Sequence, residues 1–340
     1  MDTNEIILNW YDSEKRNLPW REPDKNKIDV YKVWISEIML QQTTVMAVIP
    51  YFQKFITRFP NINILAESDI EEVLTYWAGL GYYSRARNLH KCSKQIVEKF
   101  NGDFPREAEI LIKLPGIGDY TASAICAIGY NQHKVALDVN VKRVISRINN
   151  KHNLCNISIK KLAINILSED RPGDFNEAIM DIGSKYCKSK FPKCSICPIN
   201  KICKTFKYNK NALIEINKRK PIKEKIIKYG NCYLIKRKDD NKFLFIRRPS
   251  KGLLGGMLSF PSSLWVMDKK NIPSSKLFDD LITNESIKGP IHHTFSHFNL
   301  ILNVYNIKII DGVDIEGEWI ELNKAKEQLP SLMKKVANLV

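Results

Sequence analysis

Four cysteines occur within one window of 17 residues: Cys187, Cys194, Cys197 and Cys203. The gaps between them are six, two and five residues. Thiolates are soft ligands, and four of them on one short loop suit a zinc ion or an iron–sulfur cluster. Structural zinc sites usually pair two short Cys-x-x-Cys clips, whereas this segment has one such clip with a wider gap on each side. The spacing therefore favours an iron–sulfur cluster over zinc, and disulfides are the weakest alternative.

Length, charge and the other cysteines limit the class of protein. The chain has 340 residues and a formal net charge of +16, which allows two or three domains and indicates a polyanionic partner. A lysine-rich composition that reflects nucleotide bias is the alternative explanation of the charge. Cys92, Cys126, Cys155 and Cys232 are scattered, which indicates reduced thiols in a reducing compartment. Because no apolar segment reaches 18 residues and no apolar N-terminal run follows a basic stretch, we expect a cytoplasmic protein that does not span a membrane.

The hydrophobic period is helical up to about Cys203. Amphipathic runs with short polar breaks predict eight helices. They lie at Ile28–Thr43, Ile70–Leu80, Arg85–Lys99, Glu107–Leu114, Tyr120–Gly129, Val141–Asn149, Ile157–Leu167 and Asp174–Tyr186. We therefore expect an all-α domain over residues 1–206.

The period changes to two after a basic stretch. Lys204–Lys228 holds nine basic and two acidic residues, which predicts a basic linker at residues 207–225. Alternating apolar residues then predict strands and one closing helix. These lie at Ile226–Lys236, Phe243–Arg248, Gly289–Phe295, Leu300–Ile310 and, for the helix, Ser331–Leu339. We therefore expect an α+β domain over residues 226–340.

A glycine-rich turn separates two of the expected helices at residues 114–118, Leu-Pro-Gly-Ile-Gly. Its two glycines permit positive φ and a close approach of another backbone. N–H groups at the start of the following helix suit a DNA phosphate. A plain helix–helix turn is the alternative. We count Leu114, Gly116 and Gly118 as candidate DNA-binding residues.

The turn, the cysteine loop downstream and the basic charge together resemble the helix-hairpin-helix DNA glycosylases of the endonuclease III superfamily. In that superfamily the four cysteines hold one [4Fe–4S] cluster, so the resemblance implies this cofactor here. Its bifunctional glycosylase/lyases carry a Schiff-base lysine two residues after the second hairpin glycine, where this chain has Tyr120. A phenol cannot form an imine with a sugar, which opposes lyase chemistry.

Glu37 interrupts an otherwise apolar helical run. Its neighbours at helical spacing include Trp34 and Leu40. Such a setting desolvates the carboxyl group, raises its pKa and keeps it protonated as a general acid. A helix-surface glutamate is the alternative. The segments Ser36–Thr43 and Trp77–His90 are similar to the signatures of the A/G-specific adenine DNA glycosylases, the MutY family.

Asp138 is a second candidate carboxylate, at the start of an expected helix. It suits an N-cap, and a capped aspartate is also fixed in position and kept ionised by the helix terminus. The resemblance implies that Glu37 protonates adenine at N7 and that Asp138 stabilises the oxocarbenium ion or traps it transiently. It also implies that Asn140 and Tyr120 support the site. Val139 stands where the family usually has glycine, which bears on the local backbone geometry.

An adenine inside a duplex must be flipped out to reach these groups. Gln42 and Tyr82, both in family motifs, are the candidates to fill or wedge the base stack; core packing is the alternative for Tyr82. Lysines between the first two cluster cysteines would meet phosphates, with solvated surface charge as the alternative. These lysines are Lys188, Lys190 and Lys193. Lys142 is a further candidate DNA contact.

The C-terminal half carries its own signature at His293–Phe298, between two expected strands. A satisfied surface histidine is the alternative, but the segment resembles the family loop that recognises 8-oxoguanine, which assigns Phe295, Ser296 and His297. Gly252–Met257 resembles part of the same domain, which has the Nudix (MutT-like) fold. Because no glutamate-rich segment follows residue 226, we expect this domain to recognise its ligand and not to hydrolyse it.

These resemblances imply a multidomain protein in which a helix-hairpin-helix glycosylase domain with a [4Fe–4S] loop precedes a Nudix-like domain. The implied function is monofunctional excision of adenine mispaired with 8-oxoguanine or guanine in duplex DNA, during base excision repair. We expect a nucleoid-associated monomer. The alternatives are an endonuclease III-like glycosylase/lyase and a non-catalytic iron–sulfur protein that binds DNA or senses redox state.

Overall fold

The computed structural model describes residues 2–22, 27–208, 225–249, 252–274, 278, 287–309 and 315–340. The chain divides into two compact units. The first is Met1–Ser68 with Asn88–Lys220, and the second is Asp69–Arg87 with Pro221–Val340. The expected basic linker at residues 207–225 lies almost entirely outside the described residues. Within the described residues, no helix is both long enough and apolar enough to cross a membrane.

The first unit is built from helices and has no strand among its described residues. The helices are α1 (Thr3–Glu14), α2 (Val30–Leu40), α3 (Val45–Arg58), α4 (Ile62–Glu67), the larger part of α6 (Ser84–Phe100), α7 (Ala108–Leu111), α8 (Asp119–Ala124), α9 (Val139–Ile148), α10 (Asn156–Ile164), α11 (Pro172–Lys185) and α12 (Lys204–Tyr208). A π-helical turn, η2 (Ile125–Gly129), continues α8, and a 3₁₀ turn, η3 (Cys194–Ile196), lies in the cysteine loop. The all-α expectation is therefore confirmed.

Four of these helices were not predicted from the sequence: α1, α3, α4 and α12. α1 starts with a capping box formed by Asp2 and Glu5, and its short apolar stripe buries Ile7 and Tyr11. α3 contains Pro50, a residue that usually ends a helix because it lacks a backbone donor. α1 and α3 therefore depend on burial against the rest of the unit.

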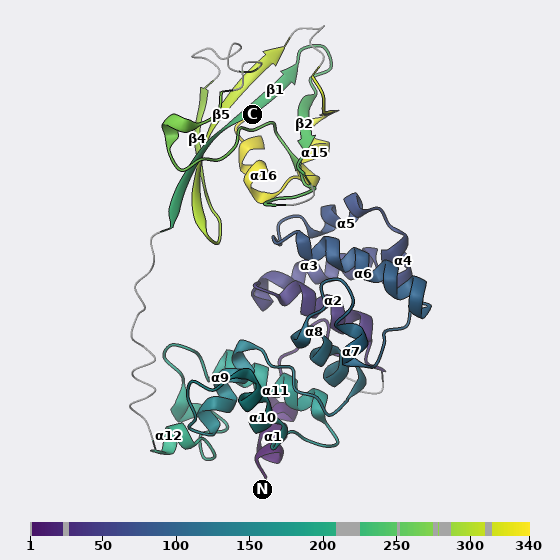
Figure 1. The fold of residues 1–340 in the computed structure, drawn as a ribbon, viewed down its shortest axis with the longest axis vertical. Helices are drawn as coiled ribbons and strands as arrows, with labels where there is room; N and C mark the ends of the chain where they lie inside the picture. The colour runs from purple at the N-terminus through teal and green to yellow at the C-terminus, as the bar shows by residue number, and fades with distance from the viewer. Residues whose placement is uncertain are drawn as a thin grey trace. The chain divides into compact units, whose positions relative to one another are not determined.

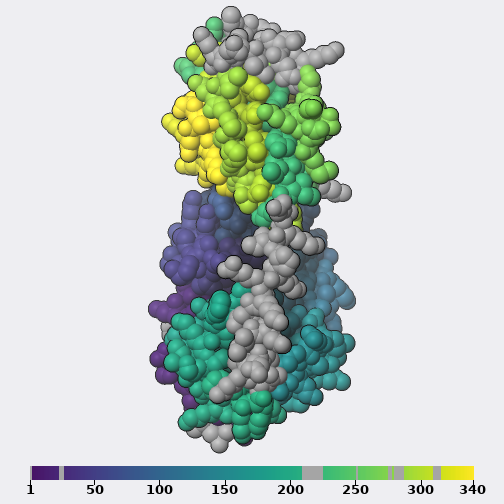
Figure 2. Space-filling model, turned by 90° about the vertical axis from the view of Figure 1, so that its left-hand side faces the viewer, coloured from purple at the N-terminus to yellow at the C-terminus, as the bar shows by residue number. Residues whose placement is uncertain are grey.

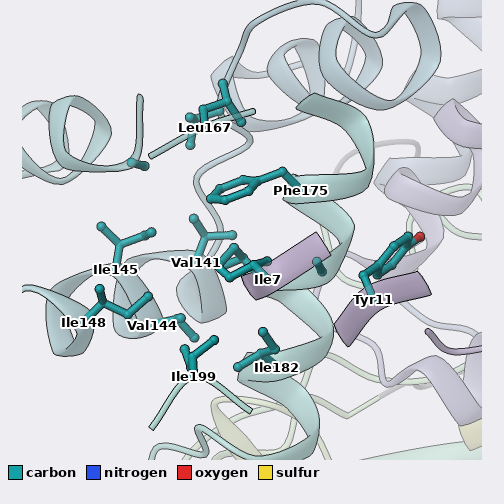
Figure 3. Close-up of a cluster of buried hydrophobic side chains, with 14 of the residues drawn as sticks. Ile7, Tyr11, Val141, Val144, Ile145, Ile148, Leu167, Phe175, Ile182 and Ile199 are labelled. Atoms are coloured by element: carbon teal, nitrogen blue, oxygen red, sulfur yellow. The ribbon is translucent and has the colours of Figure 1, made fainter. Parts of the chain in front are cut away.

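One core of this unit joins α1, α9, α10 and α11. Figure 3 shows aliphatic side chains of α9 facing Phe175 and Ile182 of α11, with Ile7 of α1 between the two helices. Eleven of the 14 residues of α11 are buried. A helix buried almost all round lies at the centre of its unit, so the acidic residues that α11 carries are removed from bulk water.

The larger part of the second unit is a mixed β-sheet (Figure 1). The unit also includes α5 (Ile70–Trp77). Its strands are β1 (Ile226–Arg237), β2 (Phe243–Arg247), β3 (Leu258–Ser259), β4 (Ile287–Thr294), β5 (Phe298–Ile309) and β6 (Glu318–Ile320). The order is β3-β2-β1-β5-β4, with β6 paired to β2. β1 and β5 run parallel in one continuous register, from Ile226 opposite Phe298 to Arg237 opposite Ile309. The four expected strands correspond to β1, β2, β4 and β5, and the α+β expectation is confirmed.

Two closing helices, α15 (Leu322–Gln328) and α16 (Ser331–Ala337), cover one face of this sheet. Their buried residues share a core with alternate residues of β1, β4 and β5, for example Leu332 with Leu234 and Leu302. In Figure 2 the yellow atoms of the closing helices lie directly against the lime-green strands. The short turn between β4 and β5 is left at the edge of this layered structure.

Candidate active site

The carboxyl group of Glu37 is buried in the second half of α2. The helix starts after Asp29, which caps it by accepting hydrogen bonds from the backbone N–H groups of Tyr31 and Lys32. Glu37 is only 6 % exposed, as its apolar neighbours predict. Burial raises the pKa of Glu37 to about 7, although the hydrogen bond from Tyr120 opposes this rise. Near neutral pH the group can therefore both hold and release a proton.

Tyr120 reaches Glu37 from α8, directly after the glycine-rich turn. Its hydroxyl donates a 2.7 Å hydrogen bond to Oε2 of Glu37, and α2 and α8 lie side by side (Figure 1). Gly116 has φ +80°, and a Cβ there would meet Cβ of Asn88 at 2.9 Å, so the turn requires glycine at this position. Gly118 has φ −103° and open space beside it. Of the two glycines, only Gly116 uses the conformational freedom that was expected of both.

Asp138 caps α9 and is held by two hydrogen bonds. Its Oδ1 accepts from the backbone N–H of Val141 at 2.6 Å, and its Oδ2 accepts from Nδ2 of Asn140 at 2.8 Å. These two bonds fix the orientation of the carboxyl group at the start of α9. Val139 is 71 % exposed and begins the right-handed helix, with no positive φ. The backbone at this position therefore accommodates valine without strain.

Arg143 connects this carboxylate to the cysteine loop. Its guanidinium donates to Oδ1 of Asn140 at 2.7 Å, to the carbonyl of Gly183 at 2.9 Å and to the carbonyl of Cys187 at 2.6 Å. α11 approaches α9 closely here, because a Cβ on Gly183 would lie 2.7 Å from Cβ of Asn140. The position of Asn140 thus depends on both neighbouring segments.

A polar network that the pattern analysis missed lies beside Glu37. Nε of Arg21 is 2.9 Å from Oε1 of Glu177, and Nη1 of Arg21 is 2.8 Å from Oδ2 of Asp181. The hydroxyl of Tyr11 donates to Oε2 of Glu177. Burial alone would raise the pKa of Asp181, but the bonds and charges of Arg21 and Arg16 outweigh it and lower this pKa.

Arg16, Arg21 and Glu177 of this network line one pocket together with Glu37. Its empty space is about 410 Å³, part of it open to solvent. Its lining residues are Arg16, Leu18, Trp20, Arg21, Val33, Ser36, Glu37, Leu40, Val45, Ile128, Glu177 and Met180. An apolar pocket with a few convergent polar groups is typical of a small-molecule or base site. The sequence signal for it is the pair Glu177 and Asp181, which are four residues apart and therefore lie on one face of an expected helix.

The four cysteines of the loop line a second pocket. Cys187, Cys194, Cys197 and Cys203 line it, together with Arg147 and mostly apolar side chains. Nη1 of Arg147 lies 3.3 Å from Sγ of Cys187. Among the described residues, no group of three or more His, Cys, Asp or Glu side chains is placed to hold a single metal ion. Four thiols that line one pocket are a donor set that fits an iron–sulfur cluster.

The candidate DNA contacts are mostly exposed. Gln42 and Tyr82 both have left-handed backbones, with φ of +59° and +50°. Lys188, Lys190 and Lys193 are exposed on the cysteine loop, and Lys142 is half-buried on α9. The side chain of Leu114 is buried, so the hairpin can present only the backbone of this residue to a ligand.

In the second unit the turn Phe295–His297 joins β4 to β5. The backbone N–H of Phe295 donates to the carbonyl of Phe298 at 2.9 Å, and the ring of Phe295 packs against Trp265. This leaves Ser296 and His297 exposed. Oγ of Ser296 lies 2.6 Å from the hydroxyl of Tyr82, which belongs to the same unit. The two motifs therefore line one pocket of about 980 Å³ of open space.

Comparison with known proteins assigns the family. Residues 35–163 match the HhH-GPD superfamily of base excision DNA repair proteins, and residues 232–339 match the NUDIX domain. The adenine DNA glycosylase of Buchnera aphidicola subsp. Baizongia pistaciae is 40 % identical over 94 % of this chain and 91 % of its own. The chain belongs to the adenine DNA glycosylase family. The human adenine DNA glycosylase is 33 % identical over 92 % of this chain and 67 % of its own.

Solved structures agree on the fold of the glycosylase half. A thermostable thymine-DNA glycosylase is similar with a TM-score of 0.55 and 25 % identity, over 60 % of this chain and 94 % of its own. Endonuclease III in a non-covalent DNA complex has a TM-score of 0.52 and 20 % identity, over 61 % of this chain and 95 % of its own. The chain is thus an adenine DNA glycosylase of base excision repair, with a helix-hairpin-helix domain and a Nudix-like domain. The expected family, fold class and enzyme class are confirmed.

Proposed function

We propose that this adenine DNA glycosylase excises adenine opposite 8-oxoguanine or guanine in duplex DNA and leaves an abasic site without cutting the strand. The observation that carries the proposal is the buried carboxyl group of Glu37, with a pKa of about 7 and a hydrogen bond from Tyr120. This pair supplies a proton donor where a lyase of the superfamily supplies an amine. A flipped adenine enters the pocket between Glu37 and the Arg21–Glu177 pair, which offers both hydrogen-bond donors and acceptors.

The reaction is proposed to begin with proton transfer from Glu37 to N7 of adenine. Protonation makes the base a neutral leaving group, and the glycosidic bond breaks with positive charge developing on the sugar. Asp138, held in position by hydrogen bonds from Val141 and Asn140, stabilises the oxocarbenium ion or traps it transiently. Water then adds to C1′, and its extra proton returns to a carboxylate of the site.

Four thiolates, those of Cys187, Cys194, Cys197 and Cys203, are proposed to hold one [4Fe–4S] cluster. When bound, the cluster supplies four iron–sulfur bonds that cross-link the loop and a one-electron redox centre. Arg147 donates toward Cys187, and the loop presents Lys188, Lys190 and Lys193 to the DNA backbone. Gln42 and Lys142 and the hairpin backbone at Gly116 and Gly118 complete the proposed DNA contacts.

The Phe295–His297 turn is proposed to read the base opposite adenine. Its exposed Ser296 and His297 carry hydrogen-bonding groups beside Tyr82, the proposed wedge. The additional hydrogen-bonding edge of 8-oxoguanine gives these groups a feature that guanine lacks. A tenfold difference in affinity between the two mispairs would correspond to about 1.4 kcal/mol.

One assay tests the function. The protein is incubated with duplexes that hold one adenine opposite 8-oxoguanine, guanine or thymine, and strand cleavage is compared with and without hot alkali. Alkali-dependent cleavage at adenine opposite 8-oxoguanine and guanine is the expected result. Cleavage without alkali would instead indicate lyase chemistry, and absence of any abasic product would indicate a non-catalytic protein. Glu37→Gln is expected to bind the duplex and release no adenine.

A further inference from the structure

The loop that carries Tyr82 is held in an unfavourable backbone conformation. Tyr82 has φ +50°, in the left-handed region that bulky aromatic residues rarely adopt. Gly79 and Gly81, which precede it, also have positive φ, of +108° and +79°. Tyr82 is nevertheless 42 % exposed, so its packing against the core is incomplete. Specific contacts must therefore keep the ring in this position.

Arg85, in the first turn of α6, supplies such contacts. Its guanidinium carbon lies 5.3 Å from the ring centroid of Trp77 and 5.5 Å from that of Tyr82. Its Nη2 donates to the carbonyl of Gly81 at 3.2 Å, and Nε1 of Trp77 donates to the same carbonyl at 3.1 Å. The backbone N–H of Arg85 donates to the carbonyl of Tyr82 at 2.8 Å. One residue thus contacts both rings and closes the turn between them.

Burial strengthens this arrangement. Arg85 is 9 % exposed, and Trp77 is completely buried. Desolvation lowers the pKa of Arg85 to about 10, so the guanidinium remains charged at neutral pH. A desolvated cation is attracted more strongly to an aromatic face than an exposed one. Arg85 therefore contacts one ring that is fixed by burial, Trp77, and one ring that solvent reaches, Tyr82.

We propose that Arg85 is a positioning residue. It holds the exposed Tyr82 in the conformation that enters the base stack of DNA. The inference rests on the proposed function, in which Tyr82 wedges the duplex. Arg85 itself needs no contact with DNA. Without it, the Tyr82 loop relaxes, and DNA binding must restore the strained conformation. A substitution of Arg85 should therefore weaken DNA binding and base unstacking. It should leave the chemical step nearly unchanged, because Glu37 and Asp138 are unchanged.

The test uses the full chain and a duplex with adenine opposite 8-oxoguanine and 2-aminopurine next to the 8-oxoguanine. The fluorescence of 2-aminopurine reports unstacking, and the dissociation constant is measured with 2′-fluoro-2′-deoxyadenosine at the target, which resists cleavage. Arg85→Met is expected to weaken binding about five- to thirty-fold and to reduce the fluorescence. The single-turnover rate at saturating protein should change by less than about threefold, because that step lies after positioning.

A double-variant cycle separates positioning from general stability. In the Tyr82→Leu background, Arg85→Met should have no further effect on binding, because the ring that it holds is gone. Since loss of a buried cation also affects folding, Arg85→Lys gives a second test: lysine keeps the charge but lacks the planar group that contacts both rings and Gly81. It should give a smaller loss that also disappears in the Tyr82→Leu background. Lys94→Met, which removes an exposed cation from the same helix, is the matched control.

The possible results are distinct. The role of Arg85 would be overturned if Arg85→Met weakened binding equally in both backgrounds, or if it left the 2-aminopurine fluorescence unchanged. Normal excision by the unsubstituted protein would leave the proposed function intact in that case. Unstacking by the unsubstituted protein without adenine release would overturn the proposed function, and the binding cycle would still decide the role of Arg85.

Discussion

The hydroxyl of Tyr120 donates a 2.7 Å hydrogen bond to Oε2 of the buried Glu37. This bond joins the helix after the hairpin to the helix that carries the proposed acid. It stabilises the carboxylate, whereas burial and the charges of Asp138 and Glu177 stabilise the protonated form. The balance leaves the pKa of Glu37 at about 7, close to the pH at which a general acid is most effective.

Replacing Tyr120 by phenylalanine should move the pH dependence of excision. Excision requires protonated Glu37, so the rate of the unsubstituted enzyme should fall as pH rises through about 7. Loss of the phenol removes a bond that lowers this pKa, and the fall should move to higher pH by roughly one to two units. Single-turnover rates between pH 5 and 9 measure the shift. Tyr31→Phe is the matched control, because the Tyr31 hydroxyl donates to the carbonyl of Phe59; a downward shift for Tyr120→Phe would refute the prediction.

Glu37→Gln should stabilise the fold at alkaline pH while it abolishes excision. The pKa of Glu37 rises from 4.5 to about 7 on folding, so its contribution to stability is fully present below pH 4.5 and is lost as pH rises through 7. Glutamine has no charge to bury, and the gain in unfolding free energy should reach up to about 3 kcal/mol at pH 8. Denaturant titrations at pH 4.5 and pH 8 provide the comparison. A gain of equal size at both pH values would show that ionisation is not its cause.

Gly183→Ala should separate α9 from α11. The new Cβ would lie 2.7 Å from Cβ of Asn140 and 3.3 Å from its Cα, so the helices must move apart. We expect a loss of about 1–3 kcal/mol in unfolding free energy and a lower single-turnover rate, since Asn140 bonds to Asp138. Gly118→Ala is the control for stability, because its φ is −103° and no atom lies within 4 Å of the added Cβ. Similar melting temperatures for the two variants would contradict the steric argument.

Arg143→Lys should weaken the link between the cysteine loop and the proposed oxocarbenium site. Lysine keeps the charge but cannot donate at once to Asn140, Gly183 and Cys187. The single-turnover rate should fall about ten- to hundredfold, as is typical when a supporting hydrogen bond in a site is lost. Iron content per protein, measured in parallel, should also fall. Lys161→Met, on the exposed surface of α10, is the control; an unchanged rate for Arg143→Lys would exclude the proposed link.

Val139→Gly should reduce stability without improving catalysis. Val139 begins a regular helix with no positive φ, so glycine relieves no strain and adds backbone freedom to the unfolded chain. The expected cost is about 0.5–1 kcal/mol, with excision unchanged within about twofold. Thermal unfolding and single-turnover kinetics test both parts. A clear increase in the excision rate would contradict the prediction and would show that the valine side chain obstructs the substrate.

The sequence by itself determined the local and periodic features of this protein. Helical periodicity, the change to period two and the apolar run around Glu37 depend on neighbours a few residues away. They predicted the all-α and α+β halves, four strands of the sheet and the burial of Glu37. α1 and α3 were missed because a short stripe and Pro50 carry too weak a local signal. The cysteine spacing likewise indicated one site, and the four side chains line one pocket.

Only the tertiary structure decided which distant groups meet. Arg21 and Glu177 are 156 positions apart and reveal their pairing only when α11 is buried at the centre of its unit. Gly183 matters because Asn140 of α9 lies against it. Arg85 matters because the fold brings the rings of Trp77 and Tyr82 to the same guanidinium. Such pairings arise from chain packing, which places side chains by shape and desolvation and not by their spacing in sequence.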